Sequence, residues 1–203
     1  MFYELATLSG PLLKLAEIDA AAQEWMAGAA AGTVLGRWRT DIGHLGQVLL
    51  LRQFDSWKYL SEERRRALLD RDPFRVRGLA TSVAQESYEG FPFLLEAAPR
   101  KAGGIYEFRT YFLAVGGVPA TLDCWQAAIE PAKDYTDHLV INMFALDGRP
   151  RILHIWGFES LRQRSELRER HYAAGTWPPK GGPEHIDHAT SVIALSNEGS
   201  LLS

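Results

Sequence analysis

The chain has 203 residues, enough for one large domain or for two of about 100 residues each. Its 46% hydrophobic and 23% charged residues are typical of a folded globular protein. With 22 basic and 25 acidic residues, the net charge of −3 argues against nucleic-acid binding, which needs a concentrated basic surface. The single cysteine, Cys124, excludes an internal disulfide framework and a thiolate metal site, and its helical context predicts a buried structural thiol.

Membrane insertion and secretion are not expected. The N-terminal stretch MFYELATLSG has neither a basic n-region nor an apolar h-region. The apolar run VLLL at 48–51 is far too short to span a bilayer. A cytoplasmic location is therefore the expectation.

The first half predicts the element order β-α-β-β-α-β. A strand over 3–9 is separated by Gly10-Pro11 from a helix over 12–26, in which apolar residues recur at helical spacing. Strands over 33–40 and 47–54 follow, with a turn at 41–43. Asp55-Ser56 supplies the cap of a helix over 56–70, and a strand over 81–91 completes the unit.

The second half predicts the same order. It has a strand over 105–112, a helix over 118–132, a strand over 139–146, a turn at 147–150 and a strand over 152–158. A helix over 160–175, a long loop over 176–188 and a strand over 189–195 complete it. This order is the split βαβ arrangement of the ferredoxin-like fold.

Internal repetition supports the division into two copies. Tyr3-Glu4 with Thr7 recurs as Tyr106-Glu107 with Thr110. The tripeptide FDS at 54–56 has the similar counterpart FES at 158–160, and ATSV at 80–83 recurs at 189–192. Matches that stay in order over the whole length indicate a tandem repeat. We predict a first repeat over 1–95, a linker over 96–104 and a second repeat over 105–203.

The predicted sheets need a second layer of cover. The strands over 47–54 and 152–158 are apolar on both faces, whereas helices of this fold cover one face only. The open faces must pack together within one chain, or against another chain in a homo-oligomer. The predicted class is therefore α+β, with two tandem ferredoxin-like βαββαβ domains paired in a dimeric α/β-barrel-type arrangement.

Several segments resemble the NIPSNAP family. They are GRWRTDIGHLGQVLLLRQFDS at 36–56, ERRRALLDRDPF at 63–74, SVAQES at 82–87, HIWGFES at 154–160 and GTWPPK at 175–180. The resemblance implies the dimeric α/β-barrel superfamily, and the family has no settled common activity. Relatives in that superfamily include cofactor-free monooxygenases, haem-handling enzymes, and lyases or isomerases.

Each half keeps a different part of the family pattern. In the first half, Leu50, Arg52 and Phe54 stand where the family favours His, Trp and Tyr, and Gly46 replaces Asn. In the second half the His-x-Trp pair is kept, but ALDGRP replaces the turn of the family motif.

The stretch from Arg37 to His44 is one candidate site. In an alternating strand Arg37 and Arg39 share a face and would anchor an anionic substrate, while Trp38 points the other way as a pocket wall. Asp41 or His44 would act as the acid or base. The alternative is a strand and turn whose polar residues face solvent.

His154 and Trp156 are the other candidate site. They share a face of the strand over 152–158, so His154 is a candidate general acid or base and Trp156 a candidate wall for a substrate. The alternative is a core histidine satisfied by one hydrogen bond.

Other polar clusters favour structural interpretations. His185 and His188 lie in a Gly/Pro-rich segment without a further ligand set, so no metal site is predicted. The sequence also has arginines at 64–66 and at 162, 164, 168 and 170. They are interleaved with glutamates at 62, 63, 166 and 169, which predicts solvated helix faces.

Three classes of function remain open. The first is a small-molecule binder or enzyme, monooxygenase-, lyase- or isomerase-like, which works without a cofactor in a pocket between sheet and helices. The second is a non-catalytic scaffold that binds a partner. The third, implied by the superfamily resemblance, is haem or metal handling, with a haem ligand drawn from the histidines at 154, 171, 185 and 188.

Overall fold

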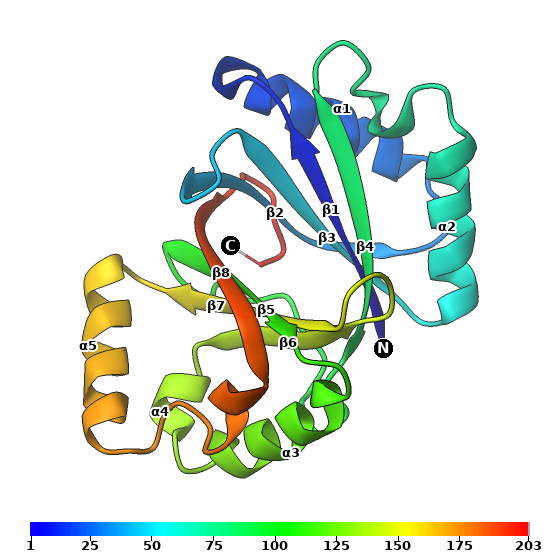
Figure 1. The fold of residues 1–203 in the computed structure, drawn as a ribbon. Coiled ribbons are helices and arrows are strands. Elements are labelled where there is room, and N and C mark those ends of the chain that lie inside the picture. The colour runs from blue at the N-terminus through cyan, green and yellow to red at the C-terminus, as the bar shows by residue number, and fades with distance from the viewer. Residues whose placement is uncertain (203) are drawn as a thin grey trace.

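The structure, a computed structural model, describes residues 1–202 (Figure 1). The elements of the first half are β1 (Phe2–Ser9), α1 (Leu15–Ala27), β2 (Thr33–Ile42), β3 (Gln47–Phe54), α2 (Trp57–Leu69) and β4 (Ser82–Gly90). Those of the second half are β5 (Ile105–Leu113), α3 (Gly117–Ile129), α4 (Lys133–Thr136), β6 (Leu139–Ala145), β7 (Arg151–Phe158), α5 (Leu161–Ala173) and β8 (Ile186–Ser196). Short 3₁₀ turns lie at Leu12–Lys14, Pro73–Arg75 and Gly182–His185. The predicted order of strands and long helices is confirmed, but the helix predicted over 118–132 ends at Ile129 and is followed by the short helix α4, which was not predicted.

The strands of the described chain form one closed antiparallel barrel in the order β1-β3-β2-β8-β5-β7-β6-β4. Each half supplies a four-stranded sheet. The sheets are joined where β2 pairs with β8, with Thr40 opposite Ala194, and where β4 pairs with β6, with Tyr88 opposite Ala145. The barrel therefore closes within one chain, which the sequence left open between one chain and two.

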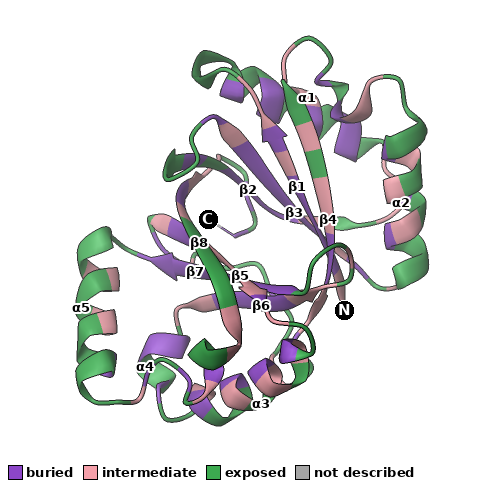
Figure 2. Ribbon diagram, in the orientation of Figure 1, coloured by how far each residue is buried: buried purple, intermediate pink, exposed green. Residues whose placement is uncertain are grey.

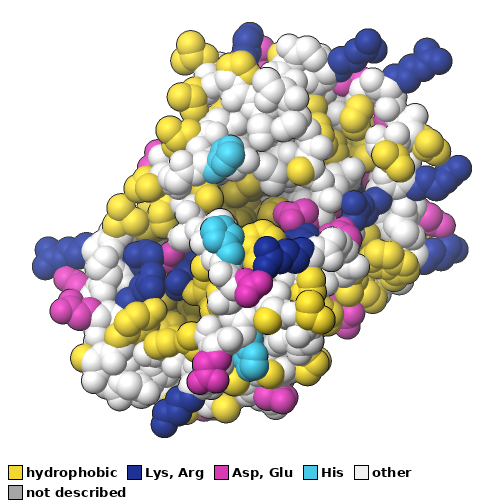
Figure 3. Space-filling model, viewed as in Figure 1, with side chains coloured by type: hydrophobic (Ala, Val, Ile, Leu, Met, Phe, Trp, Pro, Cys, Tyr) yellow, Lys and Arg dark blue, Asp and Glu magenta, His cyan; other side chains and the backbone are white. Residues whose placement is uncertain are grey.

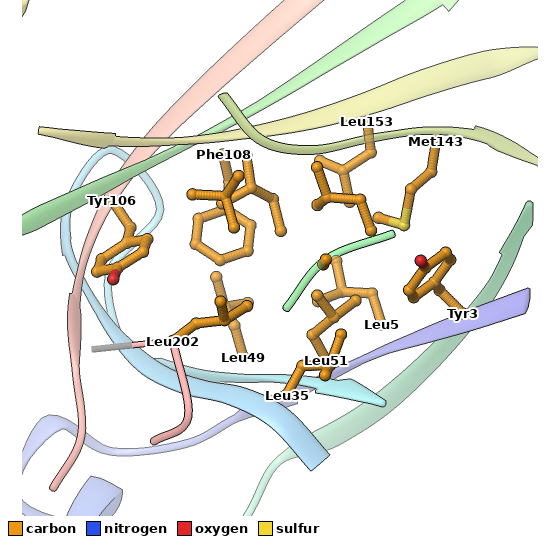
Figure 4. Packing of buried hydrophobic residues seen from close by; sticks show 14 of the residues in the cluster. Tyr3, Leu5, Leu35, Leu49, Leu51, Tyr106, Phe108, Met143, Leu153 and Leu202 are labelled. Carbon is orange, nitrogen blue, oxygen red and sulfur yellow. The ribbon is translucent and has the colours of Figure 1, made fainter. Parts of the chain in front are cut away.

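Apolar side chains fill the barrel interior, as Figure 4 shows for residues from both sheets. Leu49, Leu51, Phe108 and Leu153 meet near its centre, and Leu202 of the C-terminal segment is buried with them. The interior of an eight-stranded barrel is just wide enough for side chains to fill it, and here they do. Binding chemistry is therefore to be sought outside the barrel, where the helices lie.

The helices cover the outer faces of the two sheets, and the buried residues of Figure 2 lie along the strands and the inward helix faces. Helices α1 and α2 pack on the first sheet, and the apolar cluster between them includes Trp25 of α1. Helices α3, α4 and α5 lie over the second sheet, whose outer cluster includes Trp125 and Trp156. Each half thus has its own sheet–helix layer, separate from the barrel interior.

The equivalent helices α2 and α5 begin alike. The Ser56 hydroxyl accepts a hydrogen bond from the backbone N–H of Tyr59, and the Ser160 hydroxyl accepts one from Gln163. Such caps stabilise a helix by about 1 kcal/mol each. The predicted cap at Ser56 is confirmed, and its repeat at Ser160 reflects the internal duplication.

Four local expectations were wrong. Strand β2 continues through Asp41 to Ile42, because it pairs with β8 up to that point, so the turn follows at 43–46. Strand β8 begins at Ile186 within the predicted loop. Cys124 is half-buried rather than buried. The match of ATSV at 80–83 with ATSV at 189–192 is not a structural equivalence. Leu8 of β1 and Tyr111 of β5 occupy equivalent positions, and they lie opposite Val83 and Ala189. Val83 is therefore equivalent to Ala189 and not to Val192.

No helix within residues 1–202 has both the length and the apolar character needed to cross a membrane.

Candidate functional site

Three polar side chains form a row across the outer face of the second sheet. Arg109 of β5 lies directly opposite His154 of β7, and His154 lies directly opposite Asn142 of β6. Residues directly opposite each other in antiparallel strands point to the same face of the sheet. We call Arg109, His154 and Asn142 the polar row. Although both side chains are polar, His154 is fully buried and Asn142 is 1% exposed, and they lie among apolar side chains.

The protonation state of His154 follows from its neighbour Trp156. The indole Nε1 donates a hydrogen bond to His154 Nδ1 over 2.6 Å. Because an indole N–H can only donate, Nδ1 must be unprotonated and the proton of the neutral ring lies on Nε2. Burial, followed by the charges of Arg109 and Arg168, lowers the pKa of His154 well below its ordinary value of 6.5. His154 is therefore a neutral ring that presents an N–H donor at Nε2.

The polar row has buried polar atoms without hydrogen-bond partners in the described chain. They are Nε2 of His154, Nε and Nη1 of Arg109, and both side-chain atoms of Asn142. Most buried polar atoms in folded proteins are paired, and leaving one unpaired costs about 1–3 kcal/mol. Several such atoms on three opposing residues mark a place where the fold has kept polarity at a cost to stability.

Aromatic rings enclose the row. The ring centroid of Tyr111 lies 4.6 Å from that of His154, and the centroid of Trp125 from α3 lies 5.0 Å from it. Tyr135 stacks on Trp156 at 4.6 Å. Burial raises the pKa values of the Tyr111 and Tyr135 hydroxyls, which keeps both neutral. A molecule reaching His154 must displace the Tyr111 or Trp125 ring, because these two rings contact it directly.

A charged cluster borders the row on the side of α5. Glu107 accepts hydrogen bonds from Arg164 Nε and Nη2 at 2.7 and 2.5 Å, and from the Ser191 hydroxyl at 2.7 Å. Burial opposes its ionisation, but these bonds and the charge of Arg109 hold the pKa of Glu107 below its ordinary value. Glu107 is therefore a fixed carboxylate. Arg109 and Arg168 approach it only to 3.8 and 4.0 Å.

The first half carries no equivalent of the polar row. Strands β1 and β3 pair in the register of β5 and β7, since Phe2 opposite Phe54 corresponds to Ile105 opposite Phe158. The row in the first half is accordingly Ala6, Leu50 and Arg37. Arg37 Nη1 donates to Asp19 Oδ2 over 2.5 Å. The two copies have thus diverged at the same position of the sheet.

An ion network occupies the next position of the first half. Arg52, the equivalent of Trp156, donates to Glu4 Oε1 from Nε and Nη2 over 3.1 and 2.7 Å. Its Nη1 donates to Glu63 Oε2 over 3.1 Å. All three side chains are buried. The departure of Arg52 from the family pattern is therefore matched by acidic partners and is structural.

The structure separates the predicted site residues into groups. Arg37 and Arg39 line a cavity of about 480 Å³ between β2, α1 and residues 197–199. Trp38 points the opposite way, as predicted, into the barrel, where it contacts Tyr106 and Phe108 at ring distances of 5.4 and 5.1 Å.

The other predicted residues lie apart from that cavity. Asp41 and His44 are exposed at the end of the β2–β3 hairpin. His154 and Trp156 lie together under the helices of the second half, and none of the described hydrogen bonds or ion pairs joins them to Arg37 or Arg39.

The expectation of solvated arginines was wrong for several residues. Arg164 and Arg168 of α5 point to the sheet and to Glu107. Arg66 of α2 stacks on Trp25, with its guanidinium carbon 3.4 Å from the ring centroid, and Arg64 binds Asp147. Glutamates at helical spacing satisfied the i,i+4 pattern, but Arg64 and Arg164 reach Gln85 of β4 and Glu107 of β5, and Arg66 reaches Trp25 of α1.

Two members of the polar row were missed by sequence reasoning. Asn142 interrupts the apolar run LVINMFAL. Arg109 lies between Glu107 and Tyr111 on one face of β5, where the three side chains occupy every second position. A polar residue in the middle of an otherwise apolar strand was the available signal for Asn142. Nothing local marked Arg109, because its importance arises from the register with β7.

The residues considered for metal or haem binding lie in different surroundings. Within residues 1–202 no group of three or more His, Cys, Asp or Glu side chains is placed to hold a metal ion. His171 Nδ1 lies 2.7 Å from the Thr176 hydroxyl, and its Nε2 lies 2.7 Å from Asp134 Oδ1. His154 is enclosed by Tyr111 and Trp125.

Comparisons with known proteins agree with the barrel. An anthrone oxidase-like protein of solved structure has 13% identity, covers 100% of this chain and 95% of its own, and superposes with a TM-score of 0.68. A ferredoxin fold protein from Listeria monocytogenes, related to antibiotic biosynthesis monooxygenases, has 13% identity, coverage of 98% and 95%, and a TM-score of 0.55. At such identities the likeness concerns the fold. The protein is thus a ferredoxin-like α+β barrel.

The family follows from sequence similarity. The NIPSNAP family model matches residues 106–194. A NIPSNAP family protein from Agrobacterium tumefaciens has 31% identity over 52% of this chain and 99% of its own length, with a TM-score of 0.43. The chain belongs to the NIPSNAP family. The comparison with curated proteins gave no match.

Proposed function

We propose that this protein binds a small organic molecule in the sheet–helix layer of its second half, with the polar row as the recognition site. The carrying observation is the row itself: Arg109, His154 and Asn142 lie opposite one another and have buried polar atoms without partners. A bound molecule with oxygen atoms would satisfy them. No resident cofactor is part of the proposal.

His154 would serve this site as a hydrogen-bond donor. Its Nδ1 is occupied by the Trp156 indole, and its Nε2 carries the proton. A neutral imidazole held in this tautomer can stabilise negative charge that develops on a ligand oxygen, and its depressed pKa keeps it neutral while doing so. The ring therefore suits the role of an electrophilic donor better than that of a general base.

A small-molecule screen with two matched variants tests the proposal. Ligand-observed NMR would be run with the wild-type protein, with Asn142→Leu in the polar row and with Arg39→Gln in the first-half cavity. Binders should be lost in Asn142→Leu and kept in Arg39→Gln, because Arg39 lines the other cavity. Thermal unfolding checks that each variant is folded.

The same screen distinguishes the alternatives. Loss of binding in Arg39→Gln, with binding kept in Asn142→Leu, would move the site to the first half. A wild-type protein that binds no member of the library would favour the non-catalytic scaffold.

A further inference from the structure

We infer that the molecule bound at the polar row is an organic carboxylate with an apolar body. The inference rests on the proposed function and goes beyond it by assigning the chemical class of the ligand. Its basis is the charge and hydrogen-bond balance of the side chains that face the row.

The charges around the row do not cancel. Arg109, Arg164 and Arg168 face this part of the sheet, and Glu107 is the carboxylate that lies among them in the described chain. Arg164 takes up Glu107 through two short hydrogen bonds. Asp134, the acidic residue nearest to His171, pairs with Arg170 and His171 instead. Two guanidinium charges are left over.

Arg109 is the cation that has a long ion pair but no hydrogen-bond acceptor among the described residues. Its side chain is 12% exposed, its closest carboxylate oxygen is 3.8 Å away, and its Nε and Nη1 have no hydrogen-bond partner in the described structure. A nearly buried guanidinium without an acceptor is costly, and an anionic oxygen is the acceptor that relieves it most, because charge-assisted bonds are about twice as strong as neutral ones.

The neighbouring donors fit a two-oxygen anion. His154 Nε2–H lies on the residue directly opposite Arg109, and the Asn142 amide lies on the residue beyond it. One carboxylate oxygen can therefore accept from Arg109 and the other from His154. The rings of Tyr111 and Trp125 lie against His154, and the Tyr111 ring also lies near the Arg109 guanidinium, so these two rings would pack against an apolar body.

The side chains of α5 next to the row are more exposed than the row itself. Arg164 and Arg168 are 20% and 22% exposed, and Tyr172, which accepts a hydrogen bond from Arg168, is more exposed still. On the face drawn in Figure 3, basic side chains gather between α5 and the strands of the second sheet. An approaching anion would meet these cations before Arg109, whose guanidinium carbon lies 5.2 Å from the centroid of the Tyr111 ring.

Matched acid and amide probes test the class of ligand. Benzoate, phenylacetate and 1-naphthoate would each be titrated against the wild-type protein beside its neutral primary amide. We expect the carboxylates to bind on the order of ten-fold more tightly, which is the effect of one charge-assisted contact. The preference should disappear in Arg109→Gln and fall several-fold in the more exposed Arg168→Gln.

Arg162→Gln is the control, since it removes the same charge from an exposed position of α5 that pairs with Glu166. It should keep the preference. Acids and amides that bind equally, or a preference that survives both Arg109→Gln and Arg168→Gln, overturn the inference while the proposed site stands. If no probe of either kind binds, or if Asn142→Leu leaves binding unchanged, the proposed function fails as well.

Discussion

Replacing Asn142 by leucine should stabilise the protein while removing ligand binding. Asn142 is 1% exposed, and neither its Nδ2 nor its Oδ1 has a partner in the described chain. Leucine has a similar branched shape without polar atoms, so Asn142→Leu removes the desolvation penalty of the amide. That penalty is about 1–3 kcal/mol for a buried polar group without a hydrogen bond. We expect the free energy of unfolding to rise by about that amount.

Equilibrium unfolding in urea, followed by far-UV circular dichroism, measures this change. Each kcal/mol should also raise the melting temperature by about 2–4 °C in a protein of this size. Ser87→Ala is a matched control, because Ser87 is equally buried but its hydroxyl accepts a hydrogen bond from Arg64. It should lose about 1 kcal/mol.

A loss of stability in Asn142→Leu as large as that in Ser87→Ala would contradict this prediction. The amide would then be satisfied in the folded protein without a ligand. A gain in stability together with a loss of binding is the signature of a residue kept for function at the expense of the fold.

Three further predictions concern other parts of the molecule. Because the folded-state pKa of His154 is lowered, its protonation favours the unfolded chain, and its contribution to stability is lost as the pH falls below its ordinary value of 6.5. Between about pH 6.5 and about pH 5.5, the free energy of unfolding of the wild type should therefore fall by about 1 kcal/mol more than that of His154→Asn. The asparagine oxygen of this variant can still accept a hydrogen bond from Trp156. Equal pH profiles of the two proteins would contradict a buried neutral ring. Arg52→Met should cost about 3–5 kcal/mol in urea unfolding, since it leaves Glu4 and Glu63 buried without their cation, and a cost as small as that of the exposed Arg162→Met would show that the network is dispensable. Gly36→Ala should cost about 1–3 kcal/mol and shift the fluorescence of Trp38, because an added Cβ would lie 1.8 Å from the Trp38 ring; an unchanged emission spectrum would contradict the packing described for the barrel wall.

The local sequence was informative wherever a pattern repeats along the chain. Apolar periodicity and turn residues predicted the two βαββαβ copies, and strands apolar on both faces required the two sheets to be covered. The alternation in β2 placed Trp38 opposite to Arg37 and Arg39, and the alternation in β7 placed His154 and Trp156 on one face. These features depend on the geometry of one strand or helix at a time.

The polar row depends on relations between strands and could not be derived in the same way. Arg109, Asn142 and His154 come from three strands, and only the register of β5, β7 and β6 makes them neighbours. Register is determined by which faces are buried when the whole sheet packs. The arginines of α5 illustrate the same limit, since their i,i+4 glutamates predicted a solvated face while the buried Glu107 attracts Arg164.

The sequence by itself thus determined the order and type of the strands and long helices and the duplication that relates the two halves, because these follow from short-range periodicity. Tertiary structure alone decided that the barrel closes within one chain, that the interior is packed and that the second half holds a buried row of donors without partners. Those properties come from contacts between residues far apart in the chain, and their free energies depend on burial and on neighbouring charges that no local pattern contains.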